Sequence, residues 1–436
     1  MKNSMNLSRF GILTLAPLAV AFVSATLGGC KDPDPGSTAS YVYVNANPDG
    51  NNGVEAFRRD RTTGRLTRIN RFSTGGQGFE AVAGFGSNAI ATNGQYVFAV
   101  NPGSNTVSSM RIGTDGALTL VGQQPTNGVY PVTLTVNRDL LYVGNAGYSP
   151  GTAGQAIAQG SYQGFRVGSD GALTPLNCPV VRTDVNATGG FTSGMVLNTD
   201  NTLFVGTVLL GDTVHYYNVD TNGCLTNPKT MTGLGGPFSV IYRPGAPREL
   251  YVTVALPQFY AAPSSLAPGI ARFDVDPTAA TLTQRSIYED ADKSDTALRD
   301  PCWVLFSPDG QRFWTSSFIP RSMNLFTIDS QGQIQRGSEY QPNDSVPDPQ
   351  DPNNPNARVF VASEDVTIDT QGKFLYQLRS ASANPLFGRP VQPFITVLEA
   401  VSDTSTNAGL REVQRIELPS DLVSNAGATG IVLVDR

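Results

Sequence analysis

The chain has 436 residues, 40% of them hydrophobic, with 45 glycines and 30 prolines and a formal net charge of −6. The acidic balance argues against a nucleic-acid partner. One histidine and four cysteines without a Cys-x-x-Cys spacing exclude the usual Cys/His zinc site, and neither a metal nor a cofactor is expected. Nothing in the pattern predicts a long helix, so many short strands and turns indicate an all-β fold.

The N-terminus has the features of a secretory signal over residues 1–29. Lys2 and Arg9 precede an apolar run from Phe10 to Leu27. The ending Leu-Gly-Gly-Cys resembles the lipobox of bacterial lipoproteins, which implies that Cys30 carries the lipid and begins the mature chain. The alternative is an ordinary signal peptide with an unmodified cysteine.

The segment after this signal predicts a lipid-anchored envelope protein. Residues 30–40 are rich in Pro, Asp and Ser and form a tether with nothing to bury. The mature chain has 28 basic and 36 acidic residues, or −8, so its attachment to the membrane would come from lipid and not from charge. Lys31, where an inner-membrane retention signal would have Asp, favours the outer membrane of a Gram-negative bacterium.

A short turn motif recurs along most of the remaining chain. Asp-Gly or Asn-Gly between alternating runs is the strongest short-range signal of a β-hairpin, because Gly accepts a positive φ. Seven copies occur, at 62–67, 114–119, 169–174, 221–226, 278–283, 330–335 and 406–412. Their spacings of 52, 55, 52, 57, 52 and 77 residues are typical of propeller blades.

Each hairpin follows a run of aromatic and β-branched residues. The seven runs are 41–44, 96–100, 141–143, 203–205, 250–254, 313–317 and 374–378. A further run and a tight turn lie ahead of most of them, which predicts four antiparallel strands per unit, named a to d outward from the axis. The first unit lacks strand a, so the C-terminal run 429–435 should complete it. Residues 41–436 are therefore predicted to form one closed seven-bladed β-propeller without a long exposed edge.

Long connections are predicted to gather on one face of this propeller. The b-to-c loops expand at 146–161, 256–269 and 380–393, and the d-to-a loops at 71–88, 178–192, 288–301 and 340–362. In an up-and-down propeller both kinds share one end. Insertions on one face of a repeat fold commonly mark its binding side, and neutral drift at the solvent surface is the alternative.

The strand and turn motifs carry a family resemblance. Residues 141–145 (LYVGN), the hairpins TDGALT and SDGALT, and 306–310 (FSPDG) are similar to repeats of the seven-bladed propeller lactonases, which include 6-phosphogluconolactonases and muconate cycloisomerases. The resemblance covers about residues 41–436 and implies the fold more than the activity. Catalytic members use His, Glu and Arg at the channel mouth. The corresponding openings here, 130–132 and 300–303, contain no His.

Charged residues are concentrated where inner strands should begin. For lactone hydrolysis, Glu364 or Asp365 could activate water, and Arg299 or Arg379 could stabilise the oxyanion. Ion pairs that only hold loops together are the alternative. The candidate ligand-binding residues, in the long connections of the same face, are Asp300, Arg182 and Arg389.

Other residues have a structural interpretation first. His215, the only histidine, is expected to pack on a blade. Cys178 and Cys224 are expected at opposite ends of adjacent outer strands, which argues against a disulfide between them, and buried cysteines are expected instead. The acidic run 289–295 does not fit an EF-hand loop, and the run 342–355 is of low complexity.

These features leave three functions open. The first is an envelope-anchored, lactonase-like propeller, expected to be a monomer, that binds a small molecule or protein at its long-loop face. The second is a hydrolase acting on an exported or environmental lactone, because 6-phosphogluconolactone itself is a cytosolic metabolite. The third is a scaffold for envelope proteins.

Overall fold

The protein is described by a computed structural model. The residues that the structure describes are 39–79, 86–147, 158–183, 191–255, 268–289, 300–318, 322–342, 346–347, 358–359, 361–380, 392–402, 404–422 and 428–436. The signal peptide and most of the tether lie outside these ranges.

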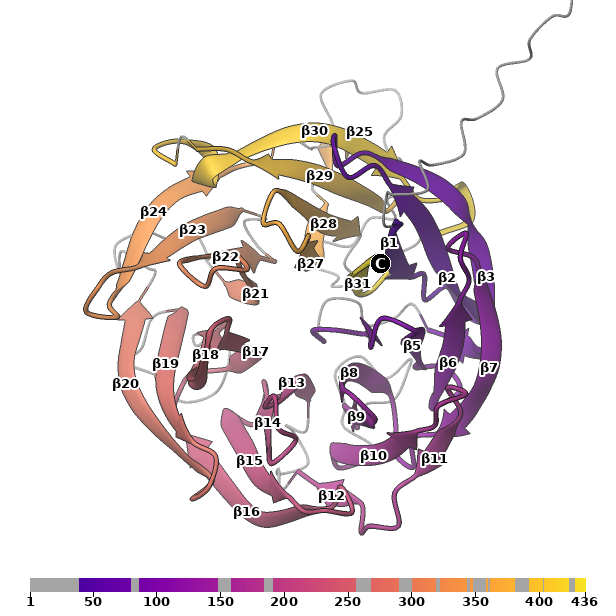
Figure 1. Cartoon of the computed structure of the whole chain (residues 1–436), viewed down its shortest axis with the longest axis vertical. Coiled ribbons are helices and arrows are strands. Elements are labelled where there is room, and N and C mark those ends of the chain that lie inside the picture. Colours follow the sequence, from indigo (N-terminus) through magenta and orange to yellow (C-terminus); the bar gives the residue numbers. More distant parts are fainter. Residues whose placement is uncertain are drawn as a thin grey trace, which may run out of the picture. The chain divides into compact units, whose positions relative to one another are not determined.

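Seven antiparallel sheets surround a central axis within residues 39–436, which confirms the predicted propeller (Figure 1). The strands of each blade are given from the axis outward. Blade 1 consists of β31 (Ile431–Asp435), β1 (Ser40–Asn45), β2 (Gly50–Arg59) and β3 (Leu66–Gly78), and blade 2 of β4 (Ile90–Thr92), β5 (Tyr96–Asn101), β6 (Thr106–Ile112) and β7 (Leu118–Pro125). Blade 3 consists of β8 (Pro131–Asn137), β9 (Leu140–Asn145), β10 (Ser161–Val167) and β11 (Leu173–Pro175), with the short β12 (Val181–Arg182) also paired to β10.

The other four blades follow the same order. Blade 4 consists of β13 (Thr192–Leu197), β14 (Leu203–Val208), β15 (Thr213–Val219) and β16 (Leu225–Thr232), and blade 5 of β17 (Pro237–Arg243), β18 (Ala246–Val254), β19 (Gly269–Asp276) and β20 (Thr281–Glu289). Blade 6 consists of β21 (Pro301–Phe306), β22 (Arg312–Ser317), β23 (Met323–Ile328) and β24 (Ile334–Tyr340), and blade 7 of β27 (Ala362–Ile368), β28 (Phe374–Ser380), β29 (Phe394–Ala400) and β30 (Leu410–Glu417). A two-stranded ladder of β25 (Val346–Pro347) and β26 (Arg358–Val359) and two 3₁₀ turns, η1 (Asn407–Gly409) and η2 (Ser420–Leu422), complete the described elements.

The C-terminal strand closes the ring. β31 pairs with β1 in antiparallel register from Ser40 opposite Asp435 to Val44 opposite Ile431. Blade 1 is therefore assembled from both ends of the propeller sequence, as predicted.

The strand order separates two faces of the ring. The a-to-b and c-to-d turns lie on one face, which we call the hairpin face, and the b-to-c and d-to-a connections on the other, the looped face. The seven predicted hairpins are all c-to-d turns. One boundary was wrong: β3 continues through residues 71–78, which had been expected to be loop. The acidic run beyond Glu289 lies outside the described residues, and so does the run 342–355 except for Pro342 and β25.

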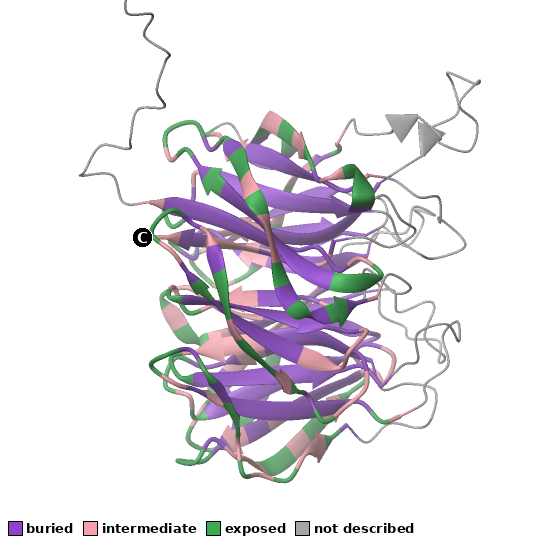
Figure 2. Ribbon diagram, turned by 90° about the vertical axis from the view of Figure 1, so that its right-hand side faces the viewer, coloured by how far each residue is buried: buried purple, intermediate pink, exposed green. Residues whose placement is uncertain are grey.

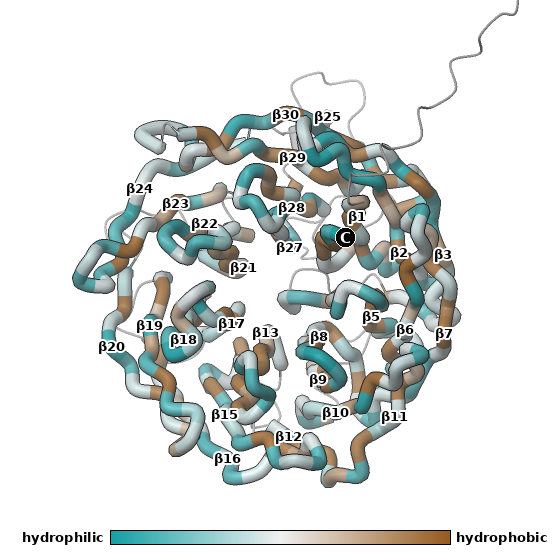
Figure 3. Tube along the Cα trace, in the orientation of Figure 1, coloured by the Kyte–Doolittle hydropathy of each residue, from teal (hydrophilic) through white to brown (hydrophobic). Residues whose placement is uncertain are grey.

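Packing follows the radial position of each strand. Every residue of the second strands β1, β5, β9 and β14 is buried, because these strands are covered by the neighbouring blades. The outermost strands β16 and β20 consist mostly of exposed and partly buried residues, and hydrophilic positions recur along them (Figure 3). An edge-on view shows buried strands across the disc and exposed residues on the turns and outer strands (Figure 2).

Each c-to-d hairpin also accepts a hydrogen bond from the preceding blade. The Tyr43 hydroxyl on β1 donates to the Gly116 carbonyl at 3.1 Å, and the Tyr96 hydroxyl on β5 donates to the Ser169 carbonyl at 2.9 Å. The remaining five pairs of neighbouring blades are joined in the same way, by Tyr142 to Gly223, Lys229 to Ala280, Arg272 to Gly332, Trp314 to Ala408 and Tyr376 to Gly64. The hairpin motif is therefore an inter-blade docking element as well as a turn.

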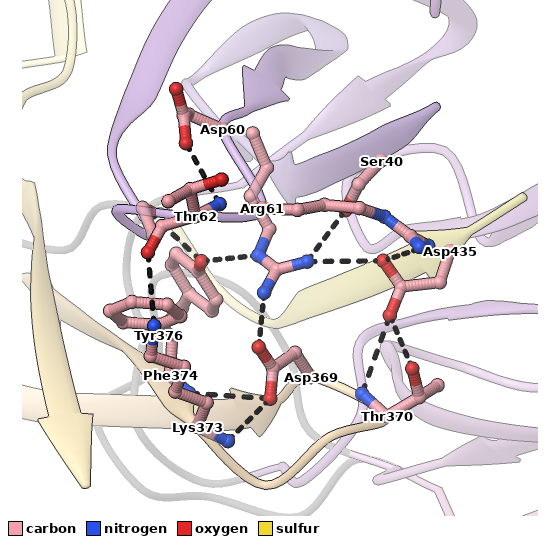
Figure 4. A network of polar contacts seen from close by, with 12 residues as sticks. Ser40, Asp60, Arg61, Thr62, Asp369, Thr370, Lys373, Phe374, Tyr376 and Asp435 are labelled. Carbon is pink, nitrogen blue, oxygen red and sulfur yellow. Dashed lines mark hydrogen bonds and ion pairs between the residues drawn. The ribbon is translucent and has the colours of Figure 1, made fainter. Parts of the chain in front are cut away.

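A buried ionic network reinforces the junction between blades 7 and 1 (Figure 4). The Arg59 guanidinium pairs with the carboxylates of Asp369 and Asp435 and donates to the hydroxyl of Tyr376 at 2.7 Å. Asp369 and Tyr376 belong to blade 7, whereas Asp435 lies on the closing strand. The network therefore joins the first and last blades near the hairpin face.

A disulfide joins Cys178 to Cys224, which corrects the prediction from the sequence. The outer strand of blade 3 does not run straight from its hairpin. β11 ends at Pro175 opposite Phe165, and strand pairing with β10 resumes at Val181 opposite Tyr162, so residues 176–180 of the outer strand form a bulge opposite residues 163 and 164. Leu176 in this bulge packs against the c-to-d hairpin of blade 4, because a Cβ atom added to Gly223 would lie 2.9 Å from a methyl group of Leu176. The cysteines therefore meet at the hairpin of blade 4.

Docking of the hairpins predicts a large cost for a side chain at Gly171. Its φ is +85°, and an added Cβ would lie 2.1 Å from Cε1 of Tyr96. We expect Gly171→Ala to lower the free energy of unfolding by about 2–4 kcal/mol, from left-handed strain plus overpacking. Gly94→Ala is the matched control, since its φ is +88° with no atom within 4 Å, and it should cost about 1–2 kcal/mol. Equal losses in chemical denaturation would contradict a role for docking.

Candidate functional site

The inner strands are irregular where they begin at the looped face. In blades 3 to 7 the pairing between strands a and b skips a residue, at 131/133, 192/194, 237/240, 301/303 and 363/365. In blades 6 and 7 the extra residues are Cys302 and Glu364. A β-bulge redirects a side chain, and bulges are common next to active sites.

Glu364 is the most unusual of these bulged residues. Its side chain is 1% exposed, and its Oε1 atom has no hydrogen-bond partner among the described residues. Burial raises the pKa of Glu364 well above its ordinary value, and the negative charge of Asp365 raises it further. Glu364 therefore holds its proton at pH values where an exposed glutamate is ionised.

Asp365 has a different environment although it is the next residue. Its carboxylate accepts backbone N–H groups from Val366 at 2.9 Å and Ile431 at 3.1 Å, and a third from Asn88. Burial raises the pKa of Asp365 to about 7, and these three bonds oppose the rise. The side chain thus connects blade 7 to the closing strand of blade 1 and to the entry of blade 2, so its contacts are structural.

Blade 6 contributes a buried acid and a thiol beside Glu364. The Cys302 thiol donates to the Asp300 carboxylate at 3.8 Å, and both side chains are buried. Burial raises the pKa of the Cys302 thiol well above its usual value, and the charges of Asp300 and Glu364 add to the rise. The thiol therefore stays protonated, which makes it a poor nucleophile.

Arg379 supplies a positive charge on the neighbouring strand of blade 7. It is fully buried opposite Ser363 and donates to the Val361 carbonyl at 2.8 Å and to Gln377 Oε1 at 3.3 Å. The Gln377 amide in turn donates to the hydroxyls of Ser316 and Ser363, both at 2.9 Å. This network joins blades 6 and 7 and fixes the position of the guanidinium.

The predicted site residues are thus only partly gathered. Asp300, Glu364, Asp365 and Arg379 lie on adjacent strands of blades 6 and 7, whereas Arg182 lies on β12 of blade 3. Arg299, Arg389 and Cys30 lie outside the described residues. His215 is buried on β15, 3.0 Å from the Thr213 hydroxyl and 3.2 Å from the Tyr217 hydroxyl, which confirms that it packs on a blade.

Comparison with known proteins agrees with this architecture. A sequence model of the family "Lactonase, 7-bladed beta-propeller" matches residues 37–147 and 87–237, which span the first four blades. The chain belongs to the lactonase family of seven-bladed propellers. No curated protein sequence matches it.

Solved structures share the fold of this lactonase-family chain at low sequence identity. The periplasmic gluconolactonase PpgL of Pseudomonas aeruginosa is 15% identical with a TM-score of 0.64, over 91% of this chain and 99% of that one. A provisionally assigned 6-phosphogluconolactonase from Bacteroides fragilis is 17% identical with a TM-score of 0.60, over 93% and 100% of the two chains. At such identities the likeness establishes the fold alone.

Within this lactonase-family propeller, the blade 6–7 cluster has the components of acid–base chemistry. Glu364 is a buried carboxyl whose pKa is raised well above its ordinary value, and Arg379 is a buried cation on the neighbouring strand β28. Among the described residues, no group of three or more His, Cys, Asp and Glu side chains could hold a metal ion. No described helix is long and apolar enough to cross a membrane.

Glu364 should make the fold less stable as the pH rises. An acid whose folded-state pKa is raised stabilises the fold below its unfolded value, here 4.5, and loses that contribution as the pH rises through the folded value. Glu364→Gln does not titrate, so we expect it to become progressively more stable than the wild type from pH 4.5 upward, as measured by urea denaturation at several pH values. The exposed Glu417→Gln is the control. A stability difference that does not change with pH would contradict the burial of an unpaired acid.

Proposed function

We propose that the protein is a lactone hydrolase with Glu364 as its acid–base group. The observation that carries the proposal is the bulged, buried Glu364 carboxyl with an unpartnered oxygen, on an inner strand of a lactonase-family propeller. A carboxyl whose raised pKa favours the protonated form can return a proton to a leaving group, and once ionised it can accept one; ester hydrolysis requires both steps.

The proposed reaction uses one water molecule for each lactone. The ionised Glu364 takes a proton from water as the water oxygen bonds to the lactone carbonyl carbon. The charge of Arg379 favours the negative charge that develops on the carbonyl oxygen. The ring C–O bond then breaks, and Glu364 returns its proton to the departing ring oxygen, which yields a hydroxy acid.

The proposed substrate is an exported or environmental lactone. PpgL is described as a periplasmic gluconolactonase, which supports this substrate class. A phosphorylated cytosolic lactone would not reach an exported enzyme.

Catalysis by Glu364 predicts a large loss of activity on its replacement. We expect Glu364→Gln to lower kcat/KM for glucono-δ-lactone at least about 100-fold in a pH-stat assay corrected for spontaneous hydrolysis. Because the base must be ionised, wild-type activity should rise with pH through a pKa above that of an ordinary glutamate. Glu417→Gln should keep full activity.

The outcomes of this assay separate the alternatives. If lactones bind to the wild type without turnover, the protein is a binding propeller. If crosslinking captures envelope proteins while no lactone binds, it is a scaffold. Turnover that survives Glu364→Gln would leave hydrolysis standing but reject this residue as the acid–base group.

We also propose that the protein is exported and anchored by a lipid on Cys30. The lipobox-like ending of the signal supports this, and so does the Cys178–Cys224 disulfide, since disulfides persist in oxidising compartments.

Lipidation predicts that a labelled fatty acid is incorporated at Cys30. We expect cells fed an alkyne-tagged palmitate to label the wild-type protein and to release Cys30→Ala unlabelled from the membrane fraction. Cys302→Ala, whose thiol is buried, should label like the wild type. Labelling of Cys30→Ala would contradict the proposal.

A further inference from the structure

A cleft opens at the looped face between blades 2 and 3, away from the Glu364 cluster. Its volume is 420 Å³, within the range of about 300–1,000 Å³ that is usual for small-molecule sites. It is lined by Ser104, Asn105, Pro125, Asn127, Gly128, Val129, Ala158, Gln159 and Arg182. All of these residues lie in or next to b-to-c and d-to-a connections.

The walls of this cleft contain residues in strained backbone conformations. The lining residues Asn105 and Asn127 have φ values of 55° and 51°, and Tyr130, which follows the lining residue Val129, has a φ of 61°. Asn enters this left-handed region more readily than other non-glycine residues, whereas Tyr seldom does. Asn105 holds the connection between β7 and β8 at two points, because its Oδ1 accepts the Tyr130 N–H at 2.7 Å and its carbonyl accepts the Thr126 N–H at 3.0 Å. Such strain persists where surrounding contacts impose it, and it clusters at ligand sites.

Arg182 gives the cleft its charge. The side chain is exposed and makes no ion pair with a described residue. Its backbone is held in β12 by pairing with Ser161, four residues after the disulfide at Cys178. The short strand and the disulfide therefore hold the Arg182 backbone beside the cleft although the outer strand of the blade is interrupted.

The neutral lining complements this cation. The lining residues include no Asp or Glu among the part of the chain that the structure describes. The Asn105 amide nitrogen and the Gln159 carboxamide make no hydrogen bond to another described residue, whereas Asn127 donates to Gln163 at 3.2 Å and keeps its oxygen as an acceptor. Carboxamides of this kind bind hydroxyl groups as donors and acceptors.

We propose that this cleft binds a small organic monoanion, a hydroxylated carboxylate. The guanidinium would bind the carboxylate through two parallel N–H bonds, and the carboxamides would bind the hydroxyl groups. A single cation on a mature chain of net charge −8 balances one negative charge better than the two of a phosphate. The site is independent of the proposed catalysis, because blades 2–3 and blades 6–7 lie on different sides of the ring (Figure 1).

Titration calorimetry with D-gluconate, D-glucitol and inorganic phosphate tests the proposal on the folded mature chain. Gluconate and glucitol share their hydroxyl groups and differ in the carboxylate. We expect gluconate to bind at least about tenfold more tightly than either of the others. Arg182→Gln should weaken gluconate binding by a similar factor, whereas Arg411→Gln, which removes an exposed guanidinium on β30, should not. Glu364→Gln should bind gluconate like the wild type, which separates this cleft from the blade 6–7 site.

A second variant tests the cleft wall. Asn105→Asp keeps the oxygen that accepts the Tyr130 N–H and adds a negative charge, so it should weaken gluconate binding at least about tenfold. Asn407→Asp, at an exposed residue with a φ of 50°, is the matched control and should bind normally. Unchanged binding in Arg182→Gln or Asn105→Asp, phosphate binding tighter than gluconate, or no gluconate binding would overturn the proposal.

Discussion

The docking of each c-to-d hairpin against the preceding blade is the constraint on which the ring depends. A propeller sheet has few contacts with its neighbours except through side chains, and a hydrogen bond to a hairpin carbonyl sets both the distance and the rotation between two sheets. The donors differ in chemistry, from Tyr43 to Lys229 to Trp314, but each one reaches a main-chain carbonyl. The constraint acts on the hairpin face and leaves the looped face free to vary in sequence and length.

The ring also has to be closed, and closure concentrates buried polar groups at the junction of blades 7 and 1. Arg59 lies near the hairpin face of this junction, between Asp369 and Asp435, and Asp365 lies nearer the axis. Removing one partner of a buried ionic network is strongly destabilising, because the other charge is left without compensation. Backbone pairing of β31 with β1 supplies the register, and these side chains make the junction specific.

The ring could be predicted from the sequence because turns and strands have local sequence signals. The hairpin at 114–119 and the strand at 96–100 can each be recognised from a few consecutive residues. The disulfide was missed because the bulge at residues 176–180 depends on where pairing with β10 resumes. The β-bulges were missed for a similar reason, since an extra residue such as Cys302 has no signature without its partner strand. Glu364 and Asp365 were recognised as charged candidates, but their separate roles depend on Ile431, which is far away in the chain.

The positions of these two acids connect stability with function. A bulge at Glu364 places two consecutive carboxyl groups at the closing junction, where the charge of Asp365 makes Glu364 harder to ionise and only Asp365 is compensated by backbone N–H groups. Selection for stability alone would replace the unpartnered acid by a neutral residue, since an unsatisfied buried group is costly. A proton-transfer role, as proposed for Glu364, would account for its presence on an inner strand, and the bonds of Asp365 hold the strand that carries it. The residue that closes the ring thus also positions the proposed acid–base group.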